Sequence, residues 1–135
     1  MADYKRRIAV IDDEASIGEL LERILERDFD VSVYQDVESF FLDLDEGRRF
    51  DAILCDLYME GETGGEIYED MARRWPRLSR AMIFMSGATT AEIEDMIPRQ
   101  APHNIIEKPF DIQRLREMVR HVAESSSDVG RPEAE

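Results

Sequence analysis

Short apolar runs recur five times along the chain and alternate with longer segments of mixed polarity. Each run is too short for a helix, and polar residues stand directly at its ends. Strands of a parallel sheet show such continuous apolar runs, because both faces of the sheet are covered. The predicted strands are residues 8–11, 31–34, 52–55, 81–85 and 105–106.

The segments between these strands place apolar residues at helical spacing. The clearest one follows the pattern i, i+3, i+4, i+7, i+8, which lines one face of a helix, with Ile17, Leu20, Leu21, Ile24 and Leu25. The other predicted helices carry Val37, Phe40, Phe41 and Leu44, then Ile67, Met71 and Trp75, then Ile93, Met96 and Ile97, and last Ile112, Leu115, Val119 and Val122. Asp36 and Asp111 are the predicted N-caps, and Thr89 with Glu92 has the spacing of a capping box.

Repeated alternation of strand and helix predicts an α/β fold of the (βα)5 type. Right-handed crossovers place helices on both faces of such a sheet, so we expect a doubly wound fold with five parallel strands. Open parallel sheets bind ligands at the carboxyl ends of their strands, close to the point where the strand order reverses. The residues that follow each predicted strand are therefore the first candidates for a site.

Length and composition fit one folded unit. The chain has 135 residues, and its apolar share of 43% is enough to fill a core. We place the domain at residues 1–123. Residues 124–135 lack apolar periodicity, so we expect a flexible tail or the start of a linker there.

Charge and cysteine content narrow the function classes. Seventeen basic and 31 acidic residues give a formal charge of −14, which repels nucleic acid and anionic membranes, so we expect no direct nucleic-acid or membrane binding. The first apolar run is too short for a signal-peptide core or a membrane span, and we expect a cytoplasmic protein. Cys55, the one cysteine, lies within an apolar run and is predicted to be buried without a chemical role.

Carboxylates follow two of the predicted strands. Asp12, Asp13 and Glu14 come after the first strand, and Asp56 comes after the third. Two carboxylates about 4 Å apart repel by roughly 4 kcal/mol at an effective dielectric constant of about 20, so a cluster needs protons or a cation. A few carboxylates completed by a carbonyl and waters suit Mg²⁺. Helix capping and solvated strand ends are the alternative roles for each aspartate taken singly.

Two further strand ends add a hydroxyl and an ammonium. The fourth strand leads into Ser86, which two small residues follow, and the fifth leads into Glu107, Lys108 and Pro109. A hydroxyl, a cation and an acidic metal pocket around Asp56 match phosphoryl transfer, in which positioning and charge neutralisation supply most of the catalysis. Alternatively, Lys108 answers the local negative charge and has no other role.

Four segments together resemble the receiver domain of two-component response regulators. They are Ile-Asp-Asp-Glu after the first strand, Leu-Cys-Asp-Leu-Tyr-Met with Gly64 eight residues past Asp56, Met-Ser-Gly after the fourth, and Glu-Lys-Pro-Phe after the fifth. The resemblance covers residues 5 to about 123. It implies a signalling switch in place of an enzyme, with a flavodoxin-like strand order of 2-1-3-4-5.

The resemblance also implies roles for the residues of the site. Asp56 is the phosphoacceptor, and it binds Mg²⁺ together with Asp13 and the Tyr58 backbone carbonyl, while Asp12 helps through water. The phosphoryl donor is a histidine of a sensor kinase or of a histidine phosphotransfer protein. The output passes to a downstream protein target.

Other residues surround the phosphoryl group in the same comparison. Ser86 and Lys108 contact the phosphoryl oxygens, and the Lys108–Pro109 peptide bond is expected to be cis. Tyr58 and Ala88 flank the group and influence how water reaches it.

The chain departs from the family pattern at two positions. Ile105 replaces the aromatic residue that turns inward when the switch serine or threonine moves, so that readout has no aromatic side chain here. Glu60 stands where a proline often follows the methionine, which makes the loop more acidic and less restricted.

Two other function classes compete with a phosphorylated switch. A pseudo-receiver would bind a partner through its helical faces without phosphorylation, and Ile105 and Glu60 are compatible with it. The retention of Asp12, Asp13, Asp56, Ser86 and Lys108 favours the phosphorylated switch instead. A flavin carrier or phosphatase on the same architecture fits poorly, because Asp12 and Asp13 would repel a flavin phosphate and the sequence contains no GxGxxG, P-loop or Gly-x-Ser-x-Gly motif.

Overall fold

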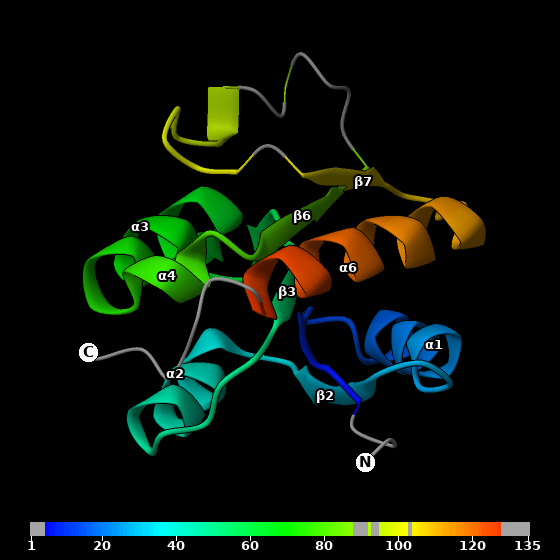
Figure 1. Ribbon diagram of the computed structural model, residues 1–135. Coiled ribbons are helices and arrows are strands. Elements are labelled where there is room, and N and C mark those ends of the chain that lie inside the picture. Colours follow the sequence, from blue (N-terminus) through cyan, green and yellow to red (C-terminus); the bar gives the residue numbers. More distant parts are fainter. Residues whose placement is uncertain (1–4, 88–91, 93–94, 103, 128–135) are drawn as a thin grey trace.

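The central sheet has five parallel strands (Figure 1). The computed structural model describes residues 5–87, 92, 95–102 and 104–127. The order of the strands across the sheet is β2-β1-β3-β6-β7. The predicted flavodoxin-like order is therefore confirmed, although the fourth strand begins one residue later than predicted. The strands are β1 (Arg7–Ile11), β2 (Asp30–Tyr34), β3 (Ala52–Asp56), β6 (Met82–Ser86) and β7 (Ile105–Glu107).

Helices cover both faces of the sheet, as the predicted doubly wound fold requires. In Figure 1, α1 and α6 lie to the right of the sheet, whereas α2, α3 and α4 lie to its left. The described helices are α1 (Ala15–Leu25), α2 (Val37–Asp45), α3 (Gly64–Arg74), α4 (Pro76–Ser79) and α6 (Ile112–Ser127). No helix among the described residues is both long and apolar enough to cross a membrane.

The two faces of the sheet carry separate apolar cores because successive side chains of a strand point in opposite directions. In β1, Ile8 and Val10 pack with residues of α1 and α6, whereas Ala9 and Ile11 pack with residues of α2 and α3. All four of these side chains are fully buried. Burial on both faces explains why the strands appear in the sequence as continuous apolar runs.

The inner face of α1 differs from its prediction at one position. Leu20 is 45% exposed, whereas Gly18, Leu21 and Leu25 are buried. A Cβ atom on Gly18 would lie 2.6 Å from Cγ1 of Val33, so the helix lies close against β2 at this glycine. Leu20 is therefore not part of the buried face of α1, although the spacing of apolar residues predicts it there. Ile112 is also wrongly predicted to be covered, since it lies in the first turn of α6 and is 47% exposed.

The helix ends follow the sequence signals in part. The carboxylates of Asp36 and Asp111 accept hydrogen bonds from the N–H groups of Ser39 and Arg114, at 2.7 and 3.2 Å, which confirms both N-caps. Helix α6 continues to Ser127, so residues 124–127 are helical where a tail is predicted. The rest of that tail, the Thr89 cap, Ile93 and Ala88 lie outside the described residues.

Candidate functional site

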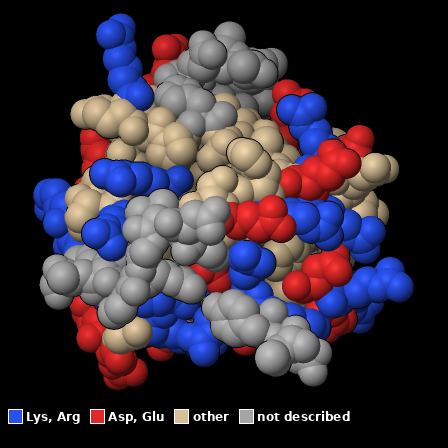
Figure 2. All heavy atoms as spheres, in the orientation of Figure 1, with Lys and Arg blue, Asp and Glu red and all other residues tan. Residues whose placement is uncertain are grey.

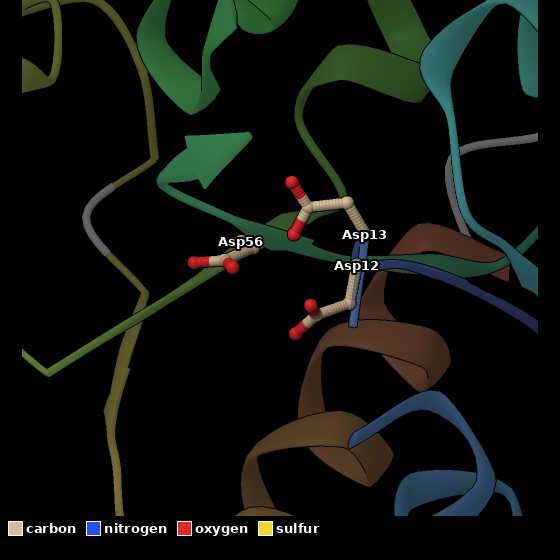
Figure 3. Close-up of side chains that lie close together, drawn as sticks. All are labelled: Asp12, Asp13 and Asp56. Carbon is tan, nitrogen blue, oxygen red and sulfur yellow. The ribbon is translucent and has the colours of Figure 1, made fainter. Parts of the chain in front are cut away.

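Three aspartates meet at the carboxyl end of the sheet. Asp12 follows β1, and Asp56 is the last residue of the neighbouring strand β3. Asp12, Asp13 and Asp56 each offer an oxygen atom, and these atoms all lie within 4.8 Å of one another. Figure 3 shows the three side chains converging. Asp12 and Asp56 are buried, at 0% and 5% exposure, whereas Asp13 is exposed.

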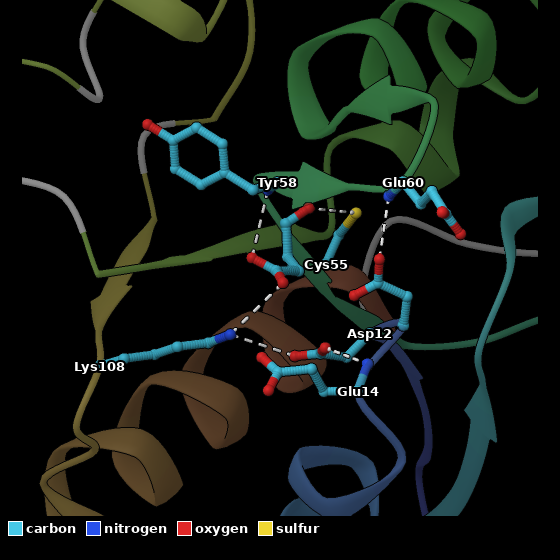
Figure 4. Close-up of polar contacts among 8 residues, drawn as sticks. Asp12, Glu14, Cys55, Tyr58, Glu60 and Lys108 are labelled. Carbon is cyan, nitrogen blue, oxygen red and sulfur yellow. Dashed lines mark hydrogen bonds and ion pairs between the residues drawn. The ribbon is translucent and has the colours of Figure 1, made fainter.

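A backbone N–H group holds each of the three carboxylates (Figure 4). Asp12 Oδ1 accepts a hydrogen bond from the N–H of Glu14 at 2.9 Å, and Asp56 Oδ1 accepts one from the N–H of Tyr58 at 3.2 Å. Both donors lie two residues beyond their acceptor. Asp13 differs, because its Oδ2 atom accepts from the N–H of Glu60, 47 residues away, at 2.9 Å.

Lys108 brings positive charge to the two buried carboxylates. Its Nζ atom lies 3.2 Å from Asp12 Oδ2 and 3.4 Å from Asp56 Oδ2. The backbone N–H of Lys108 donates to the carbonyl of Ser86, which ties this residue to the end of β6. The Lys108–Pro109 bond is cis, the isomer that the family resemblance implies.

The electrostatics of the site reflect burial and mixed charge. Burial is the main cause that raises the pKa of Asp56, and the charge of Asp12 adds to it, while the Tyr58 N–H and Lys108 act in the opposite direction. Burial lowers the pKa of Lys108, but Asp56 and Asp12 outweigh it and leave that pKa raised. The ionised form of Asp56 is therefore less favourable than that of a solvent-exposed aspartate. A bound cation would offset that cost.

The donor set fits a hard divalent cation. The three clustered ligand groups are carboxylates, and oxygen ligands of this kind are those that Mg²⁺ takes in proteins. Among the described residues, this is the one group of three or more His, Cys, Asp or Glu side chains with ligand atoms this close together.

Ser86 and Gly64 lie beside Asp56 for different reasons. Ser86 ends β6, the strand that neighbours β3, and is fully buried. Gly64 begins α3, and a Cβ atom there would lie 3.0 to 3.2 Å from atoms of Leu57 and from the carbonyl oxygen of Asp56. A larger residue would press on the backbone that carries Asp56.

Tyr58 and Ile105 lie at the periphery of the site. The Tyr58 side chain is 51% exposed, and Figure 4 shows its ring directed away from Lys108 and Asp12. Ile105 pairs with Phe84 in the sheet and is partly buried against the core on the α2 and α3 side. Cys55 is buried as predicted, and burial raises the pKa of its thiol.

The structure adds a small hairpin next to the site that the sequence does not predict. Strands β4 (Tyr58–Met59) and β5 (Glu62–Thr63) pair antiparallel directly after β3. Thr63 and Glu66 then form a capping box that starts α3. The Thr-x-x-Glu spacing was the signal that could have located this helix start.

The charge elsewhere is of mixed sign on the face seen in Figure 2, where basic and acidic side chains lie next to one another. Arg73 forms an ion pair with Asp70, and Arg74 forms one with Asp45 at 2.6 Å. Arg74 also lies 4.2 Å from the centre of the Trp75 ring. The arginines at the end of α3 thus contact carboxylates and an aromatic ring of the same molecule.

Known proteins resemble this chain over most of its length. The regulator HoxA of Cupriavidus necator, a hydrogenase transcriptional regulatory protein, is 30% identical over 93% of this chain and 26% of its own length. The transcriptional regulatory protein FixJ of Bradyrhizobium diazoefficiens is 27% identical over 96% of this chain and 62% of its own length. The chain thus spans about a quarter of HoxA and less than two thirds of FixJ.

Solved structures share the fold. Full-length FixJ from B. japonicum matches with a TM-score of 0.80 and 25% identity over 93% of this chain and 61% of that one. A CheY-like receiver domain protein from Methanospirillum hungatei matches with a TM-score of 0.80 and 20% identity over 94% of this chain and 100% of that one. The family described as the response regulator receiver domain matches residues 8–120. This chain belongs to the response regulator receiver domain family.

Proposed function

We propose that this receiver domain accepts a phosphoryl group on Asp56 and acts as a phosphorylation-dependent switch. The observation that carries the proposal is the placement of Asp56 at the end of β3, almost fully buried, with an oxygen within 4.8 Å of oxygens of Asp12 and Asp13 and 3.4 Å from the ammonium of Lys108. In this position the neighbouring carboxylates can hold a cation, and the Lys108 ammonium can neutralise negative charge on the incoming phosphoryl group.

Asp13, Asp56 and the backbone carbonyl of Tyr58 would hold Mg²⁺, and Asp12 would act through a water molecule. When bound, Mg²⁺ draws the phosphoryl oxygens toward the site and offsets the repulsion between them and the carboxylates. The clustering of the three carboxylate oxygens within 4.8 Å supports this assignment.

Asp56 is the nucleophile of the proposed transfer. One of its carboxylate oxygens bonds to phosphorus while the phosphorus–nitrogen bond of a donor phosphohistidine breaks, and the leaving imidazole nitrogen keeps the electron pair. Lys108 and the Ser86 hydroxyl contact the transferred phosphoryl oxygens, so charge is neutralised as the bond forms. Water later attacks the phosphorus, the bond from phosphorus to the carboxylate oxygen breaks, and the step releases inorganic phosphate and restores the Asp56 carboxylate.

The partners follow from this chemistry. The donor is a sensor histidine kinase or a histidine phosphotransfer protein in the cytoplasm, and the phosphorylated domain signals to a downstream protein through its surface. HoxA and FixJ are transcriptional regulators that extend beyond the region matched here, which supports an output in gene regulation for this chain.

Mass measurement after incubation with acetyl phosphate tests the proposal. Wild type should gain one phosphoryl group when Mg²⁺ is present and none when it is chelated, and Asp56→Asn should gain none. Asp51→Asn is the matched control, because Asp51 is a buried aspartate at the opposite end of β3. A wild type without a Mg²⁺-dependent adduct would instead favour the phosphorylation-independent interaction module.

A further inference from the structure

The hairpin after Asp56 reaches back to the first strand's acidic end. Its two strands leave a two-residue loop, Glu60 and Gly61, because Met59 pairs with Glu62. Gly61 has a positive φ of 88°, a conformation that glycine adopts without strain. The hairpin thereby presents the N–H of Glu60 to Asp13.

Asp13 depends on this contact more than the other two carboxylates depend on theirs. Asp12 and Asp56 are buried, and each accepts a hydrogen bond from the backbone N–H two residues further along the chain. Asp13 is exposed, and it accepts its hydrogen bond from the backbone N–H of a residue 47 positions away. The orientation of Asp13 is therefore set by the fold of the hairpin.

We infer that the backbone N–H of Glu60 is a positioning group for the cation site, which it serves by orienting Asp13. This inference rests on the proposed Mg²⁺-dependent function. The N–H engages the Oδ2 atom at 2.9 Å, and Figure 3 shows the Asp13 carboxylate directed toward Asp56. Hydrogen bonds from groups that do not touch the metal to the side chains that bind it fix the orientation of those ligands. Removing one typically weakens metal binding by about 10- to 100-fold.

The identity of residue 60 matters because proline, which has no N–H, cannot make this bond. Glutamate keeps the donor and adds a carboxylate, so two effects must be separated. Glu60→Pro removes both the N–H and the side-chain charge. Glu60→Ala removes the charge and keeps the N–H, so the difference between the two variants isolates the hydrogen bond.

The hairpin should tolerate the proline. None of the described non-glycine residues has a positive φ, so the loop combines a negative φ at Glu60 with the positive φ of Gly61. This is the sign pattern of a type II turn, in which proline is common at the first central position and glycine at the second. Thermal unfolding without Mg²⁺ would verify that both variants fold.

Calorimetric titration with Mg²⁺ compares the two variants. We expect Glu60→Pro to bind Mg²⁺ roughly tenfold more weakly than Glu60→Ala. Equal dissociation constants would overturn the inference while leaving the Mg²⁺ site in place. A wild type that binds no Mg²⁺ would instead overturn the proposed function, and the inference with it.

A spectroscopic measurement tests the contact without a substitution at residue 60. The amide proton of Glu60 should resonate further upfield in Asp13→Ala than in wild type, because its carboxylate acceptor is removed. The amide proton of Tyr58, which donates to Asp56, should move much less. A Glu60 resonance that is unchanged in Asp13→Ala would contradict the contact even if the proline variant failed to fold.

Discussion

Replacing Lys108 with methionine removes the ammonium that balances two buried carboxylates. The Nζ atom lies 3.2 Å from Asp12 and 3.4 Å from Asp56. At an effective dielectric constant of about 20, each contact corresponds to roughly 5 kcal/mol of attraction before desolvation is counted. Removing one partner of a buried pair costs about 3 to 5 kcal/mol. Since the Lys108 side chain is 21% exposed, we expect the lower end, about 3 kcal/mol of unfolding free energy.

The effect should depend on pH in a defined direction. The pKa of Lys108 is raised above its ordinary value of 10.5, so its stabilising contribution is fully present below that value and is lost as the pH rises through the folded-state pKa. The pKa of Asp56 is also raised, so as the pH falls this carboxylate takes up a proton at a higher pH than an ordinary aspartate does and loses its attraction to the ammonium. The difference between wild type and Lys108→Met should be largest between these limits and should shrink on both sides.

Denaturant unfolding in Mg²⁺-free buffer measures this difference. A loss of about 3 kcal/mol corresponds to a fall in melting temperature of roughly 10 °C for a chain of this size. Lys5→Met is the matched control, because Lys5 donates to the carbonyl of Glu26 at an exposed position, and we expect a change below about 0.5 kcal/mol. A loss below about 1 kcal/mol for Lys108→Met at pH 7, or the same loss at pH 4, would refute the electrostatic reasoning.

Three other substitutions follow from the structure. Asp56→Asn removes a carboxylate whose pKa burial raises, so at pH 7 and without Mg²⁺ the variant should unfold at a higher denaturant concentration than wild type; a lower midpoint would contradict this. Gly65→Ala would place a Cβ atom 2.2 Å from the carbonyl oxygen of Met96 and should cost about 2 kcal/mol of unfolding free energy. Gly87→Ala, whose Cβ would meet no atom within 4 Å, is its control, and equal effects would count against the packing argument. Tyr58→Ala should shorten the lifetime of the phosphorylated form by opening one side of Asp56 to water, and an unchanged decay of the adduct after donor removal would disprove this role.

Local patterns in the sequence determined the architecture and the edge of the sheet that carries the site. Continuous apolar runs predicted the strands because the sheet is buried on both faces. Since parallel strands end on one edge, the residues after the runs placed Asp12 and Asp56 at the same edge, as the structure has them. The predicted N-cap at Asp36 depended on neighbours three residues apart, which a sequence displays directly.

The tertiary structure decided every feature that depends on a distance between remote segments. Leu20 is exposed and Gly18 lies against Val33 of β2, and the spacing of apolar residues along one helix contains neither fact. The hydrogen bond from Glu60 to Asp13 joins residues 47 positions apart and depends on how the hairpin reaches back to the end of β1. Periodicity reports which face of an element is apolar, whereas closest approach between elements is set by the packing of side chains from many parts of the chain. The sequence therefore determined which residues could form the site, and packing decided how they are held.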